Sequence, residues 1–261
     1  MLSHNPFADL LPAAIMQGYV VLMFLLVLGG TLLDVVHKKS AKYFFQASQK
    51  AEKSRERNVG GGEKAAIAVK TAVHDVMLSG EFCNAKRRVA HLLGMYGFVI
   101  FLVTTVMLIF SYPTSATAAP TVLTGLWHLG ALMVCVGGYW FWFFIRVDVA
   151  AEGNSWYKIM RADLFVLALL ATTTFALAWS YLAMQGNGAW TTLALVLFVI
   201  SSTTLFGTVL WSKFAHMFFK PAAAYQRRMQ DADGSRANLP APADKPAQFG
   251  LGIKREPARH Y

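Results

Sequence analysis

The chain has 261 residues, of which 56% are hydrophobic, and its 24 Lys and Arg residues against 14 Asp and Glu residues give a formal net charge of +10. This hydrophobic content is above that of ordinary soluble domains, which excludes an average globular protein. Apolar spans divide the chain into segments, and every second segment contains no Lys or Arg. All the basic residues fall in the three remaining segments. The charge therefore indicates membrane topology and contact with anionic lipid, and no nucleic acid partner is expected.

Five apolar spans are each long enough to cross a hydrocarbon layer of ~30 Å as a helix. They cover residues 11–34, 89–111, 122–145, 164–184 and 190–211. The segments before the first span, between the second and third spans, and between the fourth and fifth contain no Lys or Arg. By the positive-inside rule, the N-terminus is predicted to be periplasmic and the C-terminus cytoplasmic. The predicted fold is an all-α membrane protein, a five-transmembrane-helix bundle in the bacterial cytoplasmic (inner) membrane.

The segments outside the spans differ in size and charge. In chain order they are a periplasmic N-terminus at 1–10, a basic cytoplasmic loop at 35–88, a periplasmic loop at 112–121, a cytoplasmic loop at 146–163, a periplasmic loop at 185–189 and a cytoplasmic tail at 212–261. The first residues lack the basic start of a cleavable signal, so the first span is expected to be an uncleaved anchor. The tail is polar, rich in Pro and Ala and without periodicity, which predicts a largely disordered segment.

An amphipathic helix is predicted within the basic loop, at about residues 63–78. One face of such a helix carries Ala66, Val69, Val73, Val76 and Met77. One interpretation is a helix that lies on the membrane surface. A second, compatible interpretation is a docking surface for a soluble subunit.

The two cysteines, Cys83 and Cys135, are expected in a cytoplasmic loop and in mid-membrane, where they cannot pair. Two thiols are too few for an iron–sulfur cluster with four Cys ligands. The sequence also has no phosphate-binding glycine loop, no paired carboxylates and no nucleophile constellation. No catalytic residues are therefore predicted in this chain, and any redox centre would use other ligands.

Histidines are the candidate ligands, because ligand-capable side chains inside a membrane are costly to bury without a partner. His91 lies two residues into the second span and His216 lies just past the fifth, so both are predicted at similar depth near the cytoplasmic interface. A b-type haem needs two axial imidazoles on opposite porphyrin faces, usually from facing helices. Gly94 and Gly97 would leave room for a macrocycle, or would allow close helix packing. The pair therefore predicts one haem b; the alternative is two hydrogen-bonded interfacial side chains.

Two further histidines remain as candidates. His128 lies six residues into the third span from the outer side, too far away to share that haem. It would hydrogen-bond a quinone carbonyl or bridge two helices. His37, beside Lys38 and Lys39 at the inner end of the first span, is an interfacial residue and the substitute haem ligand.

Three stretches carry a resemblance to a known family. They are RRVAHLLGMYGFVIFLVTT at 87–105, GNSWYKIMRADLFVLALLATTT at 153–174 and WSKFAHMFFKPAAAYQRR at 211–228, with FAHMFFKPAAA the most specific. They resemble the respiratory nitrate reductase gamma-subunit-like family, which includes membrane subunits of quinone-interacting and heterodisulfide-reductase-like complexes. Within it, the likeness is to membrane anchors associated with dissimilatory adenylylsulfate reductase. The resemblance covers about residues 89–228.

The resemblance implies a function for the whole chain. It implies a membrane anchor and electron-transfer subunit linking a cytoplasmic flavin and iron–sulfur adenylylsulfate reductase to the quinone pool. His91 and His216 match the family's haem ligands nearest the cytoplasm, whereas the positions of a second pair fall near Phe101 and Phe198, which cannot ligate iron. Two alternatives stay open: a haem-free anchor without redox chemistry, and a haem b subunit of another complex of the family.

Overall fold

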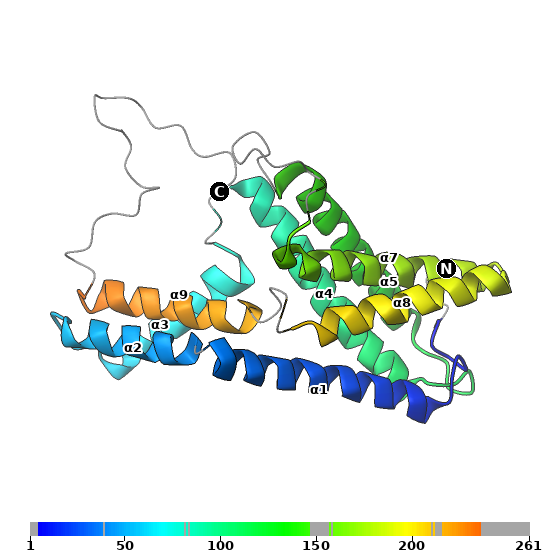
Figure 1. Ribbon diagram of the computed structural model, residues 1–261, viewed down its shortest axis with the longest axis horizontal. Helices are drawn as coiled ribbons and strands as arrows, with labels where there is room; N and C mark the ends of the chain where they lie inside the picture. The colour runs from blue at the N-terminus through cyan, green and yellow to red at the C-terminus, as the bar shows by residue number, and fades with distance from the viewer. Residues whose placement is uncertain are drawn as a thin grey trace.

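The computed structural model describes residues 5–38, 40–80, 82, 84–146, 157, 159–209, 211 and 216–235. Among these, the residues described by their backbone alone are Lys38, Ser40, Ala41, Tyr43, Ala162, His216 and Phe218. The regular elements of this part of the chain are all helical (Figure 1). Five helices are long and apolar enough to cross a membrane, which confirms the number of predicted spans. They are α1 (Ala13–Lys38), α4 (Ala85–Ser111), α5 (Thr121–Trp140), α7 (Leu164–Met184) and α8 (Gly188–Gly207).

Local sequence accounts for where several of these helices begin and end. The side chain of Asn84 accepts hydrogen bonds from the backbone N–H groups of Lys86 and Arg87 at 2.9 and 3.3 Å, which caps the start of α4. Pro120, which has no N–H to leave unsatisfied, precedes α5. Gly186 has a φ of +69° in the short turn that reverses the chain between α7 and α8.

The five long helices form two hairpins and one peripheral helix. Helix α4 packs along α5, α7 packs along α8, and the two hairpins meet through α5 and α7. Helix α1 lies against α8 and α4 with a much smaller interface (Figure 1). Many of its apolar side chains are exposed, as expected for a surface in contact with lipid.

Glycines bring α4 and α5 into backbone contact. A Cβ atom added to Gly130 would lie 2.7 Å from the backbone N of Phe101, and one added to Gly137 would lie 2.7 Å from the carbonyl O of Ala90. A Cβ on Gly97 would lie 2.8 Å from the carbonyl O of Gly130. These distances are far below normal carbon contacts, so no side chain fits. Small residues at a helix interface are the usual way to pack membrane helices closely.

Aromatic side chains fill the core at the end of the bundle where α1 begins. Phe7, from the segment before α1, packs edge-on against Trp127 and Trp179, with ring centroids 5.7 and 5.3 Å away. The same segment is held by Asn5, whose side chain donates a 2.8 Å hydrogen bond to the carbonyl of Tyr112. The N-terminal segment therefore closes this end of the bundle.

Shorter helices gather at the opposite, basic end of the bundle. They are α2 (Ser40–Lys53), α3 (Gly61–Lys70), its π-helical continuation η1 (Thr71–Met77) and α9 (His216–Ala232), and we call this group the basic cap. Helix α9 contacts η1, α3 and α2 (Figure 1). The structure differs here from the sequence-based expectation of a largely disordered tail from residue 212. Residues 216–232 are helical because α9 packs against the cap and, through Met217 and Phe219, against the core beneath it; residues 236–261 lie outside the described part of the chain.

Candidate functional site

His91 lies on the second turn of α4, where its ring is held by two neighbours. Its Nδ1 is 2.9 Å from the Oγ of Ser79. The ring of Phe82 lies against the imidazole, with centroids 4.9 Å apart. Ser79 is itself buried and has a φ of +48°, an uncommon conformation for a residue with a side chain. The orientation of His91 is therefore set by the chain that connects η1 to α4.

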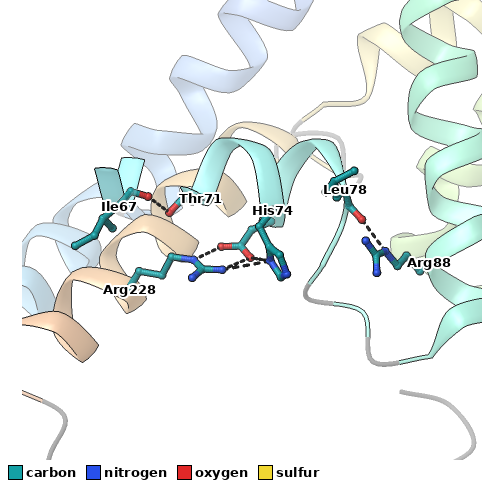
Figure 2. Close-up of polar contacts among 7 residues, drawn as sticks. Ile67, Thr71, His74, Leu78, Arg88 and Arg228 are labelled. Atoms are coloured by element: carbon teal, nitrogen blue, oxygen red, sulfur yellow. Dashed lines mark hydrogen bonds and ion pairs between the residues drawn. The ribbon is translucent and has the colours of Figure 1, made fainter. Parts of the chain in front are cut away.

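That connection runs along the first turns of α4 and is fixed by hydrogen bonds to its backbone. The hydroxyl of Tyr96 donates to the carbonyl of Met77 at 2.8 Å. Nε of Arg88 donates to the carbonyl of Leu78 at 2.7 Å (Figure 2). Two long side chains of α4 thus replace the backbone partners that the end of a helix lacks. As a result, η1 ends beside α4, level with His91.

His216 is the first residue of α9, and its side chain lies outside the described residues. Its surroundings are marked by Lys220, one turn further along α9. The Nζ of Lys220 lies 4.9 Å from the ring centroid of Phe82, and Phe82 in turn covers His91. Residues near the start of α9 and the start of α4 therefore share one neighbour, Phe82, so the two helices that carry the predicted haem ligands begin at the same end of the bundle.

The other two candidate histidines lie apart from this site. His128 is buried and joins α5 to α7: its Nδ1 donates to the carbonyl of Thr124 at 2.8 Å, and its Nε2 accepts from the hydroxyl of Ser180 at 2.8 Å. These are the contacts of a residue that bridges helices, one of its two expected roles. His37 is exposed near the end of α1.

Removal of the Ser180 hydroxyl is expected to destabilise the bundle. Ser180→Ala leaves a buried imidazole nitrogen without this partner, which costs about 1–3 kcal/mol. Thermal unfolding of the purified protein, followed by circular dichroism, measures the change. Thr191→Ala, which removes an exposed hydroxyl bonded within its own helix, is the control and should leave the midpoint nearly unchanged. Equal midpoints for the two variants would contradict the bridging role of His128.

A second side-chain contact, in addition to that of His128 with Ser180, joins α5 to α7 at the basic end of the bundle. Nε of Arg146, just after the π-helical continuation of α5, η2 (Phe141–Ile145), donates to Asp163 at 2.9 Å. The guanidinium lies over the ring of Trp142, 4.1 Å from its centroid. Asp163 also accepts from the backbone N–H of Met160 at 2.9 Å. The sequence predicts that Asp163 complements the start of the fourth span. The structure adds an ion pair with a nearly buried arginine.

The basic cap is held together by a second cluster of charges, centred on Asp75 in η1. The guanidinium of Arg228, in α9, binds both carboxylate oxygens, at 2.6 and 2.7 Å, and Nδ1 of His74 lies 2.9 Å from the same carboxylate (Figure 2). The bidentate bond to Arg228, with a smaller contribution from His74, lowers the pKa of Asp75 to about 2. Sequence reasoning missed this pair, because charges on two cap helices carry no signal that they meet.

An exposed ion pair extends the cap to the loop between α2 and α3. Nη1 of Arg57 donates to Glu63 at 2.9 Å, and its Nε donates to the carbonyl of Ala232 at 2.6 Å. The bond to Arg57 lowers the pKa of Glu63. An exposed pair contributes little to stability. Its effect is positional: one side chain connects the loop before α3 to the end of α9.

Acid is expected to weaken the cap. The pKa of Asp75 is lower in the folded protein than its ordinary value of 3.8, so its contribution is complete above that value and is lost as the pH falls toward 2. After allowance for partial exposure, the shift corresponds to about 1–2 kcal/mol. Thermal unfolding at pH 5 and at pH 2.5 measures the loss, and Asp75→Asn should reduce the difference between the two. An unchanged pH dependence in that variant would contradict this contribution.

The apolar face of the predicted amphipathic helix is turned away from the bundle. Val69, Val73, Met77 and Leu78 are between 45% and 64% exposed. Beside Lys64 and Lys70, this face suits either the membrane surface or a partner protein, as the sequence suggests. The helix itself is held by α9, which contacts both η1 and α3, and Thr71 is buried. The hydroxyl of Thr71 donates within the same helix to the carbonyl of Ile67 at 2.8 Å (Figure 2).

An apolar cavity of about 560 Å³ separates α1 from the two hairpins. It is lined from one side by α1 and from the other by α4, α7 and α8, with Phe7 near one end and Met217 near the other. Packed helices leave few spaces of this size between them, so an apolar space of this volume is a candidate binding site. The sequence carries no sign of it, since the lining residues read as ordinary apolar helix positions.

Taken together, the helices define the class of this protein: an all-helical chain whose five apolar helices indicate a multi-pass membrane protein. Among the described residues, no group of three or more His, Cys, Asp or Glu side chains is placed to hold a metal ion. Comparison with protein-family models, with curated proteins and with solved structures finds no match to this chain.

Proposed function

We propose that this chain is a bacterial inner-membrane subunit that anchors a cytoplasmic oxidoreductase and passes its electrons to quinone. The observation that carries the proposal is the basic cap, a set of ordered helices at the end of the bundle where the positive charge gathers. A periplasmic N-terminus and a cytoplasmic C-terminus follow from that charge. The chain itself makes no bonds in a substrate; it docks a partner and conducts electrons.

The partner follows from the cap and from the family resemblance. Lys and Arg side chains at this end would steer a soluble complex with an acidic rim, and the exposed face of Val69, Val73 and Met77 offers apolar contact. The resemblance makes the partner a flavin and iron–sulfur adenylylsulfate reductase, which oxidises sulfite in the presence of AMP. Electrons from its iron–sulfur clusters would then enter the membrane at the basic end.

A haem b is the carrier that the same resemblance supplies, held by His91 and His216. His91 fits that role: Ser79 holds its Nδ1 and fixes the ring, as partners of ligand histidines do. The helix that carries His216 begins beside Phe82, which covers His91. When bound there, the haem would accept and release single electrons. The residues of the chain position it and exclude water from one face of His91.

A reduced-minus-oxidised visible spectrum with a haem assay tests this site. Protein made with ample haem should carry one haem b per chain, and His91→Ala and His216→Ala should each lose it. His37→Ala and His128→Ala are the controls and should retain it. A featureless spectrum of the unmodified protein would contradict the haem.

A haem-free anchor is the second candidate, and one observation favours it. Ser79 and Phe82 pin His91 to the chain between η1 and α4, so the imidazole already has a structural role in holding the cap to the bundle. In that case the same docking surface serves a reductase whose electrons reach quinone by another route. The haem spectrum separates the two candidates.

A further inference from the structure

The cavity beside α1 has a wall without available polar groups. The hairpins contribute three hydroxyl groups to the cavity wall, and each donates at 2.7 Å to a backbone carbonyl of its own helix. They belong to Thr105, Thr172 and Ser202. The hydroxyl of Tyr19, from α1, lies 2.8 Å from that of Ser202. A water molecule needs two to four polar partners, so water does not fill a space lined in this way.

The cavity opens on the surface of the bundle along the N-terminal half of α1. Leu11, Ile15 and Phe24 line it and are about half exposed, whereas Val20 and Met23 line it and are buried. These exposed residues lie within the membrane-spanning part of α1 or at its start. The medium at the opening is therefore the hydrocarbon of the leaflet at the N-terminal end of α1.

We propose that an acyl chain of a membrane phospholipid occupies this cavity. From Ile15 to Val27 the cavity follows α1 for ~18 Å, close to the ~15 Å depth of one leaflet's hydrocarbon. The chain enters between α1 and the hairpins from the leaflet at the N-terminal end of α1. An unbranched alkyl chain supplies the dispersion contacts that a space between packed helices lacks. This inference does not depend on the proposed function.

The acyl chain completes the packing of α1. Direct contacts between α1 and the hairpins include the 3.4 Å hydrogen bond from Gln17 to the carbonyl of Ile109 and the bonds of the Tyr19 hydroxyl with Ser202 and Thr203. A third place is Gly30, where an added Cβ would lie 2.9 Å from Val209. The cavity lies against the face of α1 that carries Val20 and Val27, between and around these places. The bound chain therefore acts as part of the interface that holds the peripheral helix.

Two pairs of variants test the site, each with one substitution in the cavity wall and one at a nearby lipid-facing position. The protein is placed in bilayers of palmitoyl-oleoyl phosphatidylethanolamine, released gently, and examined by native mass spectrometry for retained lipid. Val20→Phe fills the cavity, whereas Val21→Phe adds the same ring to the lipid-facing side of α1. The unmodified protein and Val21→Phe should retain a phospholipid, and Val20→Phe should lose most of it.

A second pair on α4 covers the case in which the first variant does not fold. Val106→Phe fills the cavity from the opposite wall, and Val103→Phe is its lipid-facing control. Loss confined to Val106→Phe supports the site. Equal retention by both members of each folded pair would overturn it. Added ubiquinone or menaquinone that displaced the phospholipid at equal concentration would also overturn it, since the occupant would then be an isoprenoid tail.

Discussion

Alanine in place of Gly137 is expected to force α5 away from α4 and to destabilise the protein. The added methyl group would lie 2.7 Å from the carbonyl O of Ala90 and 2.8 Å from the Cβ of Leu93. Neither atom is the end of a flexible side chain, so a helix must move. Overpacking of a close interface costs about 1–3 kcal/mol and occasionally more. Unfolding of the purified protein in mixed detergent, followed by circular dichroism, measures the loss.

The control for this variant lies on the same helix. A Cβ on Gly125 meets no atom within 4 Å, so Gly125→Ala adds the same methyl group to α5 without a clash. It should leave stability unchanged or raise it slightly, because alanine is the better helix former. If Gly137→Ala were as stable as Gly125→Ala, the close approach of α4 and α5 would be contradicted.

Reversal of the charge at Asp75 is expected to detach α9 from η1. Asp75→Arg replaces a bidentate ion pair with two facing guanidinium groups, and breaking such a partly buried pair costs roughly 2 kcal/mol or more. Trypsin should then cut the chain faster within α9. If the cap docks a reductase, as we propose, the same variant should release that enzyme into the soluble fraction of lysed cells.

A double variant makes this test specific. Asp75→Arg combined with Arg228→Asp restores opposite charges and should recover both protection from trypsin and membrane association. Glu52→Arg is the control, because Glu52 is exposed on α2 of the same cap and its substitution raises the net charge by two, as Asp75→Arg does. Release of the reductase by Glu52→Arg to the same extent as by Asp75→Arg would show that the change in net charge, and not the ion pair within the cap, releases the partner.

The membrane-spanning helices could be predicted because each carries its own signal. A run of about 20 apolar residues reads as a span without knowledge of its neighbours, and the five helices of the structure match the five predicted spans. The amphipathic pattern at residues 63–78 is equally local, and the structure is helical over Gly61–Lys70 and Thr71–Met77. The type and position of a helix follow from the periodicity of its own sequence, whereas the helices against which it packs do not.

Contacts between distant residues account for what the sequence left open. Asp75 and Arg228 are 153 residues apart, and nothing in either helix alone indicates that they pair. Helix α9 is ordered because of that pair and of the core beneath it, and both involve residues far away in the sequence. Its own sequence is polar and contains proline, so without those contacts it predicts disorder. Gly97 is a second example of a residue whose role depends on a distant neighbour. In the sequence, a glycine that leaves room for a macrocycle looks the same as one that allows close helix packing. The position of Gly97 opposite Gly130 in the structure shows that it allows close packing.

Quinone reduction in membranes tests the central proposal most directly. Membranes with the chain and its reductase are supplied with sulfite, AMP and a short-chain quinone, and quinone reduction is followed by absorbance. Our account predicts reduction that depends on both substrates and is abolished when the chain is deleted, while the solubilised reductase still reduces an artificial dye. Quinone reduction at the same rate without the chain would contradict the proposal that this protein links the enzyme to the quinone pool.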